Sequence, residues 1–212
     1  MQIAIALFAR LTALDAIGPY EVLQRVPSLD VVFVGEKRGE VRTENGFLGL
    51  TVDATFDEVP EPDVVLVPGG NGNRELLAGG RYIDWVRHAH QGTRFTTSVC
   101  SGSLVLAAAG LLDGLTATSH WSVFDYLAKL GAVPVTQRVV EHLPERLITA
   151  AGVSAGIDMA LRLVELLVDD VAAQAAQVFI EYDPQPPYDA GHPSKVSTAV
   201  LDRVREYAAV RA

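Results

Sequence analysis

The stretch 96-TTSVCSGSLVLAAAGLL-112 decides how the chain folds, because an extended run changes into a small-residue helix within it. β-Branched and aromatic residues are frequent in the run 94-RFTTSVC-100, whereas alanine, leucine and serine dominate the residues that follow. The first composition is typical of a strand and the second of a helix. Cys100, the single cysteine of the chain, stands at the junction. The stretch therefore predicts a strand-to-helix turn that carries a thiol.

Three other apolar runs have the composition of buried strands. They are 2-QIAIALF-8, 30-DVVFVG-35 and 63-DVVLVPGG-70. Short continuous apolar runs of this kind are typical of strands covered on both faces of a parallel sheet. Helix-like segments lie between the strands, at Pro19 to Val26, Asn73 to Gln91 and Ser101 to Ala109. This alternation predicts an α/β domain with a doubly wound sheet.

The second half of the chain continues the pattern with weaker signals. The expected elements are strands at Val135 to Val140 and Leu147 to Ala150, and helices at Ala155 to Leu167, Val171 to Ile180 and Lys195 to Ala209. The segment 181-EYDPQPPYDAGHP-193 holds four of the eleven prolines, which forbid regular helix and sheet pairing. One helix after this segment is too little for a second domain. We therefore expect a single domain over residues 1–212, with an ordered proline-rich loop that rims a pocket or an interface, and a C-terminal helix.

The composition limits the classes of partner. The 212 residues are 49% hydrophobic, which suits one domain with a large core. The formal net charge of −9 repels phosphate groups, so no nucleic-acid partner is expected. No apolar stretch reaches the roughly 20 residues of a membrane helix, and the N-terminus lacks the basic region of a signal peptide. No metal-ligand spacing such as CxxC or HExxH occurs. These features predict a cytoplasmic protein without a metal site or a membrane partner.

Candidate functional groups follow three of the predicted strands. Asp15 comes shortly after the first strand, Gly69 and Gly70 end the third, and Cys100 ends the fourth. In an open parallel sheet, binding sites form beyond the carboxyl ends of the strands. We therefore expect a carboxyl group, a backbone turn and a thiol at the same edge of the sheet.

Cys100 lies in the sequence Ser98-Val99-Cys100-Ser101-Gly102, which has the small-x-nucleophile-x-Gly form of a nucleophile elbow. A tight turn would aim the thiol outward, and the positive end of the helix dipole would lower its pKa. The alternative is a buried structural cysteine, which would lie more naturally within the strand or the helix. We therefore predict a nucleophile at Cys100. Ser101 offers a hydroxyl beside it, or is only a polar residue in the first turn of the helix.

The other candidates each have two interpretations. Asp15 either exchanges protons beside the thiol or is the N-cap of a helix that begins at Gly18-Pro19. The pair Gly69-Gly70 either offers a backbone N–H to a developing negative charge or forms only a turn. His120, which follows a short predicted strand, is either close to Cys100 or a structural residue. The residues alone leave these alternatives open.

Four stretches together resemble the ThiJ/PfpI superfamily. They are 14-LDAIGPYEVL-23, 63-DVVLVPGG-70, 98-SVCSGSLVLAAAGLLDGLTATSHW-121 and 149-TAAGVSAGIDMALRLVE-165. The resemblance spans nearly the whole chain and implies a class I glutamine amidotransferase-like, flavodoxin-like fold, with a mostly parallel sheet and helices on both faces. The last two stretches are similar to a subgroup of isocyanide hydratases and of amidase-like sensor halves of transcription regulators. Only one helix follows the proline-rich loop, so we do not expect the DNA-binding half of such a regulator.

Two positions distinguish the branches of the superfamily. The PfpI-type proteases have a histidine directly after the cysteine, where this chain has Ser101. The glyoxalases and deglycases have a glutamate where this chain has Asp15. An aspartate with a small hydroxyl residue after the cysteine is similar to the isocyanide hydratases, although these more often have threonine at the place of Ser101. The resemblance therefore argues against peptidase chemistry.

This resemblance implies a cysteine-dependent hydratase that converts isocyanides, as small-molecule substrates, to N-substituted formamides, in a homodimer without a cofactor. Cys100 would attack the isocyanide carbon to give a thioimidate, and Asp15 would move the protons. Ser101 would hold Asp15 by a hydrogen bond, and Gly70 would help to stabilise charge, whereas the chemistry does not require His120. The alternatives are a redox-sensing or stress-response protein of the same superfamily, another thiol activity such as that of a glyoxalase or deglycase, and a ligand-binding module related to the sensor halves.

Overall fold

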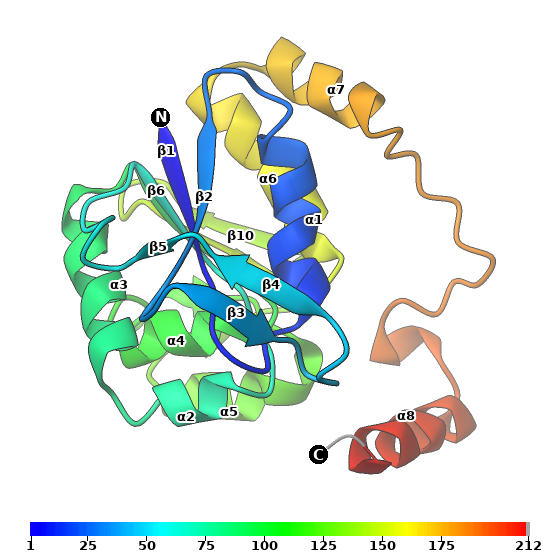
Figure 1. Ribbon diagram of the computed structural model, residues 1–212. Helices are drawn as coiled ribbons and strands as arrows, with labels where there is room; N and C mark the ends of the chain where they lie inside the picture. The colour runs from blue at the N-terminus through cyan, green and yellow to red at the C-terminus, as the bar shows by residue number, and fades with distance from the viewer. Residues whose placement is uncertain (211–212) are drawn as a thin grey trace.

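A seven-stranded sheet runs through the centre of the computed structural model, which describes residues 1–210 (Figure 1). The strand order is β10-β11-β7-β6-β1-β2-β5, in which β10 is antiparallel to β11 and all other pairs are parallel. The strands are β1 Gln2–Ala6, β2 Asp30–Gly35, β5 Ala54–Thr55, β6 Val64–Val67, β7 Phe95–Val99, β10 Val139–His142 and β11 Leu147–Ala150. The predicted α/β class with a doubly wound, mostly parallel sheet is confirmed.

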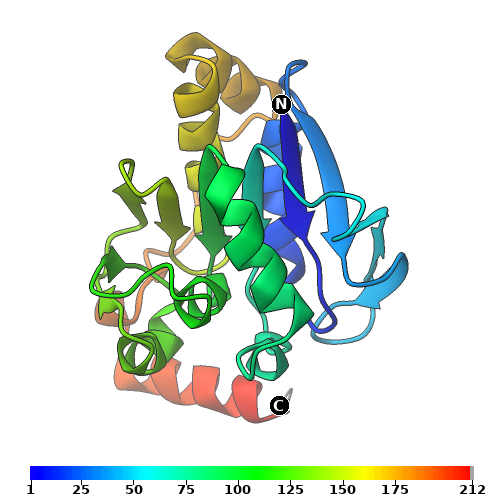
Figure 2. The same cartoon turned by 90° about the vertical axis from the view of Figure 1, so that its left-hand side faces the viewer.

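Helices cover both faces of this sheet, as Figures 1 and 2 show. Helices α1 (Ala13–Leu23) and α6 (Ala155–Leu167) pack together on one face, and α3 (Arg81–Gly92) and α4 (Gly102–Ala108) lie on the other. The remaining helices are α2 Asn73–Leu76, η1 Trp121–Val123, α5 Phe124–Lys129, α7 Asp170–Phe179, η2 Pro193–Lys195 and α8 Thr198–Val210. Two small two-stranded sheets complete the fold, β3 Gly39–Arg42 with β4 Gly49–Val52, and β8 Thr116–Ala117 with β9 Val133–Pro134.

The central strands are buried along nearly their whole length because helices cover both of their faces. Every residue of β6 is buried, as are all but the first residue of β1 and of β7. The register of the parallel pair places Val67, the last residue of β6, beside Ser98 of β7. The residues that follow these two strands therefore leave the sheet side by side at its carboxyl edge.

Helix α1 begins at Ala13, so the prediction that a helix starts at Gly18-Pro19 is wrong. Pro19 lies in the interior of the helix, where it has no N–H to donate to the carbonyl of Asp15. Packing against α6 outweighs this loss. A Cβ atom on Gly156 of α6 would lie 3.1 Å from the ring of Pro19, which shows how closely the two helices meet.

The long helix expected from Asn73 to Gln91 is instead divided into α2 and α3. Gly79 and Gly80 separate the two helices, with φ angles of 96° and 115° that a right-handed helix does not permit. The hairpin of β3 and β4 was not expected at all, because its polar strands, such as 39-GEVR-42, lack the apolar composition of the central strands. Glu44, in the loop of this hairpin, lines the cavity that holds Cys100.

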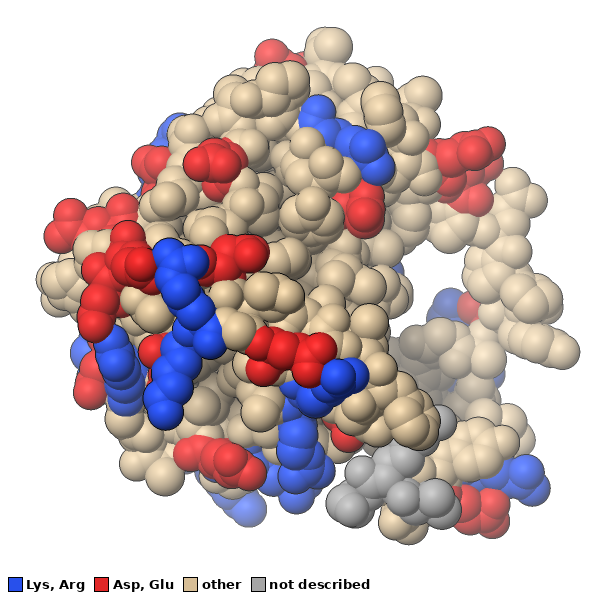
Figure 3. Space-filling view, viewed as in Figure 1, with Lys and Arg blue, Asp and Glu red and all other residues tan. Residues whose placement is uncertain are grey.

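The proline-rich segment 181–193 contains no helix or strand before η2, as its prolines predict, and it leads to α8 outside the sheet and its covering helices (Figure 1). The hydroxyl of Tyr182 donates to Asp158 of α6 at 2.9 Å and anchors the start of the segment. An opening separates the segment from the rest of the molecule in Figure 3. Together with His120 and Val153, the segment lines a cavity of about 970 Å³.

Charged side chains of both signs are interspersed on the face that Figure 3 shows. Arg38 pairs with Glu58 at 2.7 Å, and Arg42 pairs with Glu40 at 2.8 Å. This face therefore offers no continuous basic surface to a phosphate backbone. Within residues 1–210, no helix is long and apolar enough to cross a lipid bilayer.

Replacing Gly102 with alanine should lower the free energy of unfolding by about 1–3 kcal/mol, as overpacking of a tight site does. A Cβ atom there would lie 2.2 Å from the carbonyl oxygen of Val67 and 2.9 Å from that of Pro68. Urea unfolding would measure the loss. Gly92→Ala is the matched control, because its Cβ would meet nothing within 4 Å, and it should be neutral or stabilising by up to about 1 kcal/mol. Equal stabilities of the two variants would contradict this account.

Candidate active site

Cys100 forms a strained turn between β7 and α4. Its φ angle is 58°, in the left-handed region that residues with a side chain rarely adopt. The N–H of Cys100 donates to the carbonyls of Ala150 (3.1 Å) and Ala151 (3.0 Å), and its carbonyl accepts a hydrogen bond from Ser119 Oγ (2.9 Å). These bonds hold the backbone in place from both sides. The predicted strand-to-helix turn is confirmed.

Asp15 lies in the first turn of α1 and is fully buried. Its Oδ2 accepts a hydrogen bond from the N–H of Gly69 (2.8 Å), while its Oδ1 has no hydrogen-bond partner in the part of the chain that the structure describes. Thr12, not Asp15, occupies the N-cap position of the helix. The structure therefore removes the capping interpretation of Asp15, and its role in proton exchange stays a prediction.

Burial raises the pKa of Asp15 to about 7, against the lowering effect of the hydrogen bonds from Gly69 and from the Cys100 thiol. The nearby charge of Glu44 raises it further. A carboxyl group with a pKa near neutrality can both accept and release a proton under physiological conditions. This is the electrostatic property that a proton carrier beside a nucleophile requires.

Burial also raises the pKa of the Cys100 thiol, to about 12, and the charge of Asp15 adds to this effect. Hydrogen bonds from the N–H groups of Val153 and Ser101 to the sulfur act in the opposite direction. The prediction that the helix dipole lowers this pKa is wrong, because the thiol is only 6% exposed and faces a carboxylate. The resting thiol therefore keeps its proton at neutral pH.

Ser101 takes its hydrogen bond from the backbone and not from Asp15. The N–H of Gly70 donates to Ser101 Oγ at 3.0 Å. The predicted bond between Ser101 and Asp15 is wrong, because Gly69 lies between them: a Cβ on Gly69 would be 2.7 Å from Ser101 Oγ and 2.9 Å from Asp15 Oδ2. Both N–H groups are engaged within the protein in this structure, Gly69 with Asp15 and Gly70 with Ser101, and their role as donors to a developing charge stays a prediction.

Two further polar residues support the turn, and the sequence interpretation missed both. Asn73 is 3% exposed and donates from Nδ2 to the carbonyl of Ser101 at 2.9 Å. Ser119 bonds to the carbonyl of Cys100, as described above. In the sequence, Asn73 resembles an ordinary first residue of a helix, and Ser119 is far from Cys100 along the chain. Neither position has a local signal that would have identified it.

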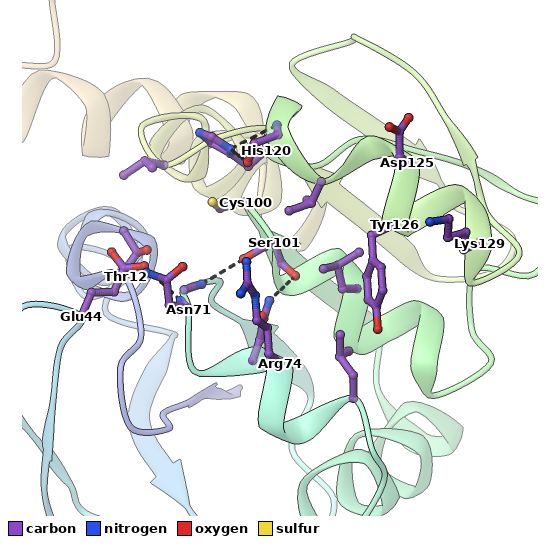
Figure 4. A pocket seen from close by; sticks show the side chains of 17 residues that line it. Thr12, Glu44, Asn71, Arg74, Cys100, Ser101, His120, Asp125, Tyr126 and Lys129 are labelled. Carbon is purple, nitrogen blue, oxygen red and sulfur yellow. Dashed lines mark hydrogen bonds between the residues drawn. The ribbon is translucent and has the colours of Figure 1, made fainter. Parts of the chain in front are cut away.

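His120 lines the cavity beside Cys100, as Figure 4 shows. Its Nδ1 lies 2.7 Å from Ser122 Oγ and accepts a hydrogen bond from the Ser122 N–H, which caps η1. Burial lowers the pKa of His120 and favours the neutral ring. No hydrogen bond joins His120 to Cys100 among the residues described, so a catalytic role for His120 stays a prediction.

A cavity of about 720 Å³ opens above Cys100. Figure 4 shows Thr12, Glu44 and Asn71 on one side, and Asp125, Tyr126 and Lys129 on the other. Leu77, Leu104 and Val123 add apolar surface to its lining. Such a volume, with an apolar wall and a few polar groups, is typical of small-molecule sites. No group of three or more His, Cys, Asp or Glu side chains in residues 1–210 is arranged to hold a metal ion.

Comparisons with known proteins agree with this geometry. The model of the DJ-1/PfpI family matches residues 1–166, which include the turn at Cys100 and the strands beside it. The chain belongs to the DJ-1/PfpI family. It is 43% identical over 209 residues to the isonitrile hydratase of Pseudomonas putida, covering 99% of this chain and 90% of that protein.

A solved structure within this family shows the same fold. The ThiJ/PfpI family protein from Pseudomonas syringae has a TM-score of 0.91 and 36% sequence identity, over 98% of this chain and 86% of its own. The transcriptional regulator CdhR of Pseudomonas aeruginosa is 30% identical over 144 residues, which are 67% of this chain but 42% of the regulator. The resemblance and the flavodoxin-like fold that it implied are thus confirmed.

Replacing Asp15 with asparagine should change how stability depends on pH. The pKa of Asp15 is raised from 3.8 to about 7, so the folded protein holds a proton that the unfolded chain releases at lower pH. The stability linked to this proton is fully present below pH 4 and is lost as the pH rises through 7. Asparagine does not ionise, so the Asp15→Asn variant does not lose stability in this way as the pH rises. Its free energy of unfolding relative to wild type should therefore rise by about 2–4 kcal/mol between pH 4.5 and 8.5. Urea unfolding at both pH values tests this, and a constant difference would refute it.

Proposed function

We propose that this protein hydrates isocyanides to N-substituted formamides, with Cys100 as the nucleophile and Asp15 as the proton carrier. The main support is the pairing of a thiol, which lies on a strained turn and lines the cavity, with a buried carboxyl whose pKa is about 7. The 43% identity to a protein named isonitrile hydratase, over 90% of its length, supports the same reaction.

In the first half of the proposed reaction, the sulfur of Cys100 forms a bond to the terminal carbon of the isocyanide. The thiol proton passes to the Asp15 carboxylate, whose charge acts on the thiol. Asp15 then returns this proton to the carbon, which leaves a neutral thioimidate bound to the enzyme. The high pKa of the thiol makes this transfer necessary, because little thiolate exists before the substrate binds.

In the second half, a water molecule adds to the thioimidate carbon. Asp15 accepts a proton from the water and delivers it to the nitrogen. The carbon–sulfur bond then breaks, the sulfur regains a proton from the hydroxyl of the adduct through Asp15, and the formamide leaves. Overall one water is added to one isocyanide, and both Cys100 and Asp15 return to their initial states.

Ser101 is the proposed donor to the substrate nitrogen. Its Oγ accepts a hydrogen bond from Gly70, so the hydroxyl proton is directed elsewhere, and the side chain borders the cavity. A hydroxyl that accepts one hydrogen bond is a stronger donor in the next.

The alternative of an oxidation sensor has less support. Peroxide attacks the thiolate, and the burial that raises the pKa of Cys100 leaves little of it at neutral pH. A pure ligand-binding module has no need for a buried carboxyl beside a thiol. Glyoxalase or deglycase chemistry is not favoured by any contact in this cavity.

Replacing Cys100 with alanine should reduce formamide formation to the uncatalysed level, because no other thiol is present. Turnover of methyl isocyanide, followed by absorbance, measures the loss. The unfolding midpoint of Cys100→Ala should stay close to that of wild type, which shows that the variant is folded. An active Cys100→Ala protein would exclude the scheme. Rapid peroxide oxidation of the wild type to a sulfinate, without any turnover, would favour the sensor.

We also propose that the protein acts as a cytoplasmic homodimer. A single reduced thiol suits a reducing compartment. Apolar side chains on α7 are strongly exposed in the single chain: Val171 is 68%, Val178 78% and Phe179 69% exposed. An apolar surface of this kind is typical of an interface between protein chains. The proline-rich segment, with Tyr188 also 78% exposed, extends beyond this helix.

Sedimentation of the wild type should give the mass of two chains. Val178→Asp places a charge on the proposed interface and should shift the equilibrium toward single chains. Phe47→Asp is the matched control, because Phe47 is 87% exposed on the distant hairpin of β3 and β4 and should not affect assembly. A monomeric wild type would contradict the proposal, and so would equal behaviour of the two variants.

A further inference from the structure

Arg74 lies on the wall of the cavity that holds Cys100, and within residues 1–210 its side chain has no hydrogen-bond or ion-pair partner. It belongs to the short helix α2, directly after Asn73. Because buried Asn73 bonds to the carbonyl of Ser101 at 2.9 Å, the backbone of Arg74 is fixed relative to the nucleophile turn. Figure 4 shows Arg74 extending from α2 on the side of the cavity nearest Ser101, away from Lys129.

Most arginines of this protein have a defined partner. Nine of the arginines in residues 1–210 form ion pairs with carboxylates. Arg94 contacts the sulfur of Met1, and Arg146 binds backbone carbonyls. Within that part of the chain, Arg10 and Arg74 form neither an ion pair nor a side-chain hydrogen bond. Both line one shallow cavity beside the active site, and Arg74 also lines the active site itself.

The charges at the cavity mouth favour an anion. Glu44 is the carboxylate on the side of Arg10 and Arg74, and its Oε1 accepts a hydrogen bond from the Asn71 N–H at 3.0 Å. Two guanidinium groups therefore stand against one carboxylate that is already engaged. On the opposite side Asp125 and Lys129 cancel each other. The four charged side chains that line the Cys100 cavity sum to zero, but Arg10 adds a positive charge from the neighbouring cavity on the side of Arg74, where a substrate anion would be attracted.

The same cavity has an apolar wall. Leu77, Leu104, Val123 and Tyr126 line it from α2, α4 and α5 and the residues beside them. Three kinds of surface thus meet in this cavity: the Cys100 thiol, the Arg74 guanidinium and an apolar wall. A ligand that uses all three has a reactive carbon, a carboxylate and a hydrocarbon group joined within a few bonds.

We infer that the substrate is an α-isocyano carboxylate with an apolar side chain, and that Arg74 binds its carboxylate. This inference rests on the proposed function and narrows its substrate class. A guanidinium binds a carboxylate through two parallel N–H···O bonds, which fixes direction as well as position. The bound carboxylate orients the isocyano carbon toward Cys100, and the apolar wall takes the side chain. Arg74 is thus a specificity residue for the proposed reaction.

The first test compares isocyanoacetate with its methyl ester, which has the same skeleton without the charge. The wild type should prefer isocyanoacetate by about tenfold in kcat/KM, mainly through KM, as expected for one charge-assisted contact near solvent. The preference should weaken at high salt, because exposed charges are screened. A wild type that handles both compounds equally, or prefers the ester, would overturn the inference.

Substitutions of Arg74 test whether this side chain causes the preference for the acid over the ester. Arg74→Gln should reduce the ratio of the two kcat/KM values to about one, and Arg74→Lys should restore only part of it, since lysine lacks the paired geometry. Lys129→Gln is the matched control, because it removes a cation on the opposite side of the cavity and should retain the ratio. A ratio unchanged in Arg74→Gln, or lost equally in Lys129→Gln, would overturn the role of Arg74.

A binding measurement separates this inference from the proposed function. If the wild type turns over neither isocyanide, the hydratase proposal fails, and calorimetry with N-formylleucine and its methyl ester then tests the subsite alone. The wild type should bind the free acid about tenfold more tightly than the ester, and Arg74→Gln should not discriminate. Equal affinities of the wild type for acid and ester would refute the carboxylate subsite, whatever the reaction.

Discussion

The close approach of the turns after β6 and β7 is the constraint on which the rest of the site depends. Gly102 touches the carbonyl of Val67 so closely that no side chain fits between them. This contact allows the N–H of Gly70 to reach Ser101 Oγ, and lets Asn73 bond to the Ser101 carbonyl. The strained backbone of Cys100 is held by these bonds and by β11 on its other side. Two parallel strands with small residues at their ends thus define the position of the thiol.

Burial at this position sets the electrostatics of the site. Asp15 and Cys100 are both nearly inaccessible to water, and burial disfavours the charged form of each. The folded state bears a cost for the buried carboxylate, which the hydrogen bond from Gly69 only partly offsets. The same cost brings the pKa of Asp15 close to neutrality, where a proton carrier works best. Stability and the proposed chemistry are therefore coupled at one residue.

Much of the site was predictable because strand ends in a parallel sheet share an edge. Asp15, Gly69, Gly70, Cys100 and Ser101 follow three strands that the apolar runs identify, and the structure brings all five together. Their hydrogen-bond partners were not predictable. Whether Ser101 bonds to Asp15 or to Gly70 depends on the position of the Gly69 backbone, which the spacing of residues along the chain does not reveal. Glu44, Asn73, Arg74 and Ser119 were missed because they reach the site from elements with no strong periodic signal.

The sequence by itself determined the alternation of the main strands with helices, the class of the sheet and the placement of the thiol at a strand-to-helix turn. Local composition and turn residues carry that information, since they act over a few neighbouring positions. Only the tertiary structure decided that α1 continues through Pro19, that the thiol has a high pKa and that Arg74 has no partner within residues 1–210. Each of these depends on burial or on contact between residues far apart in the chain, and both arise only when the elements pack.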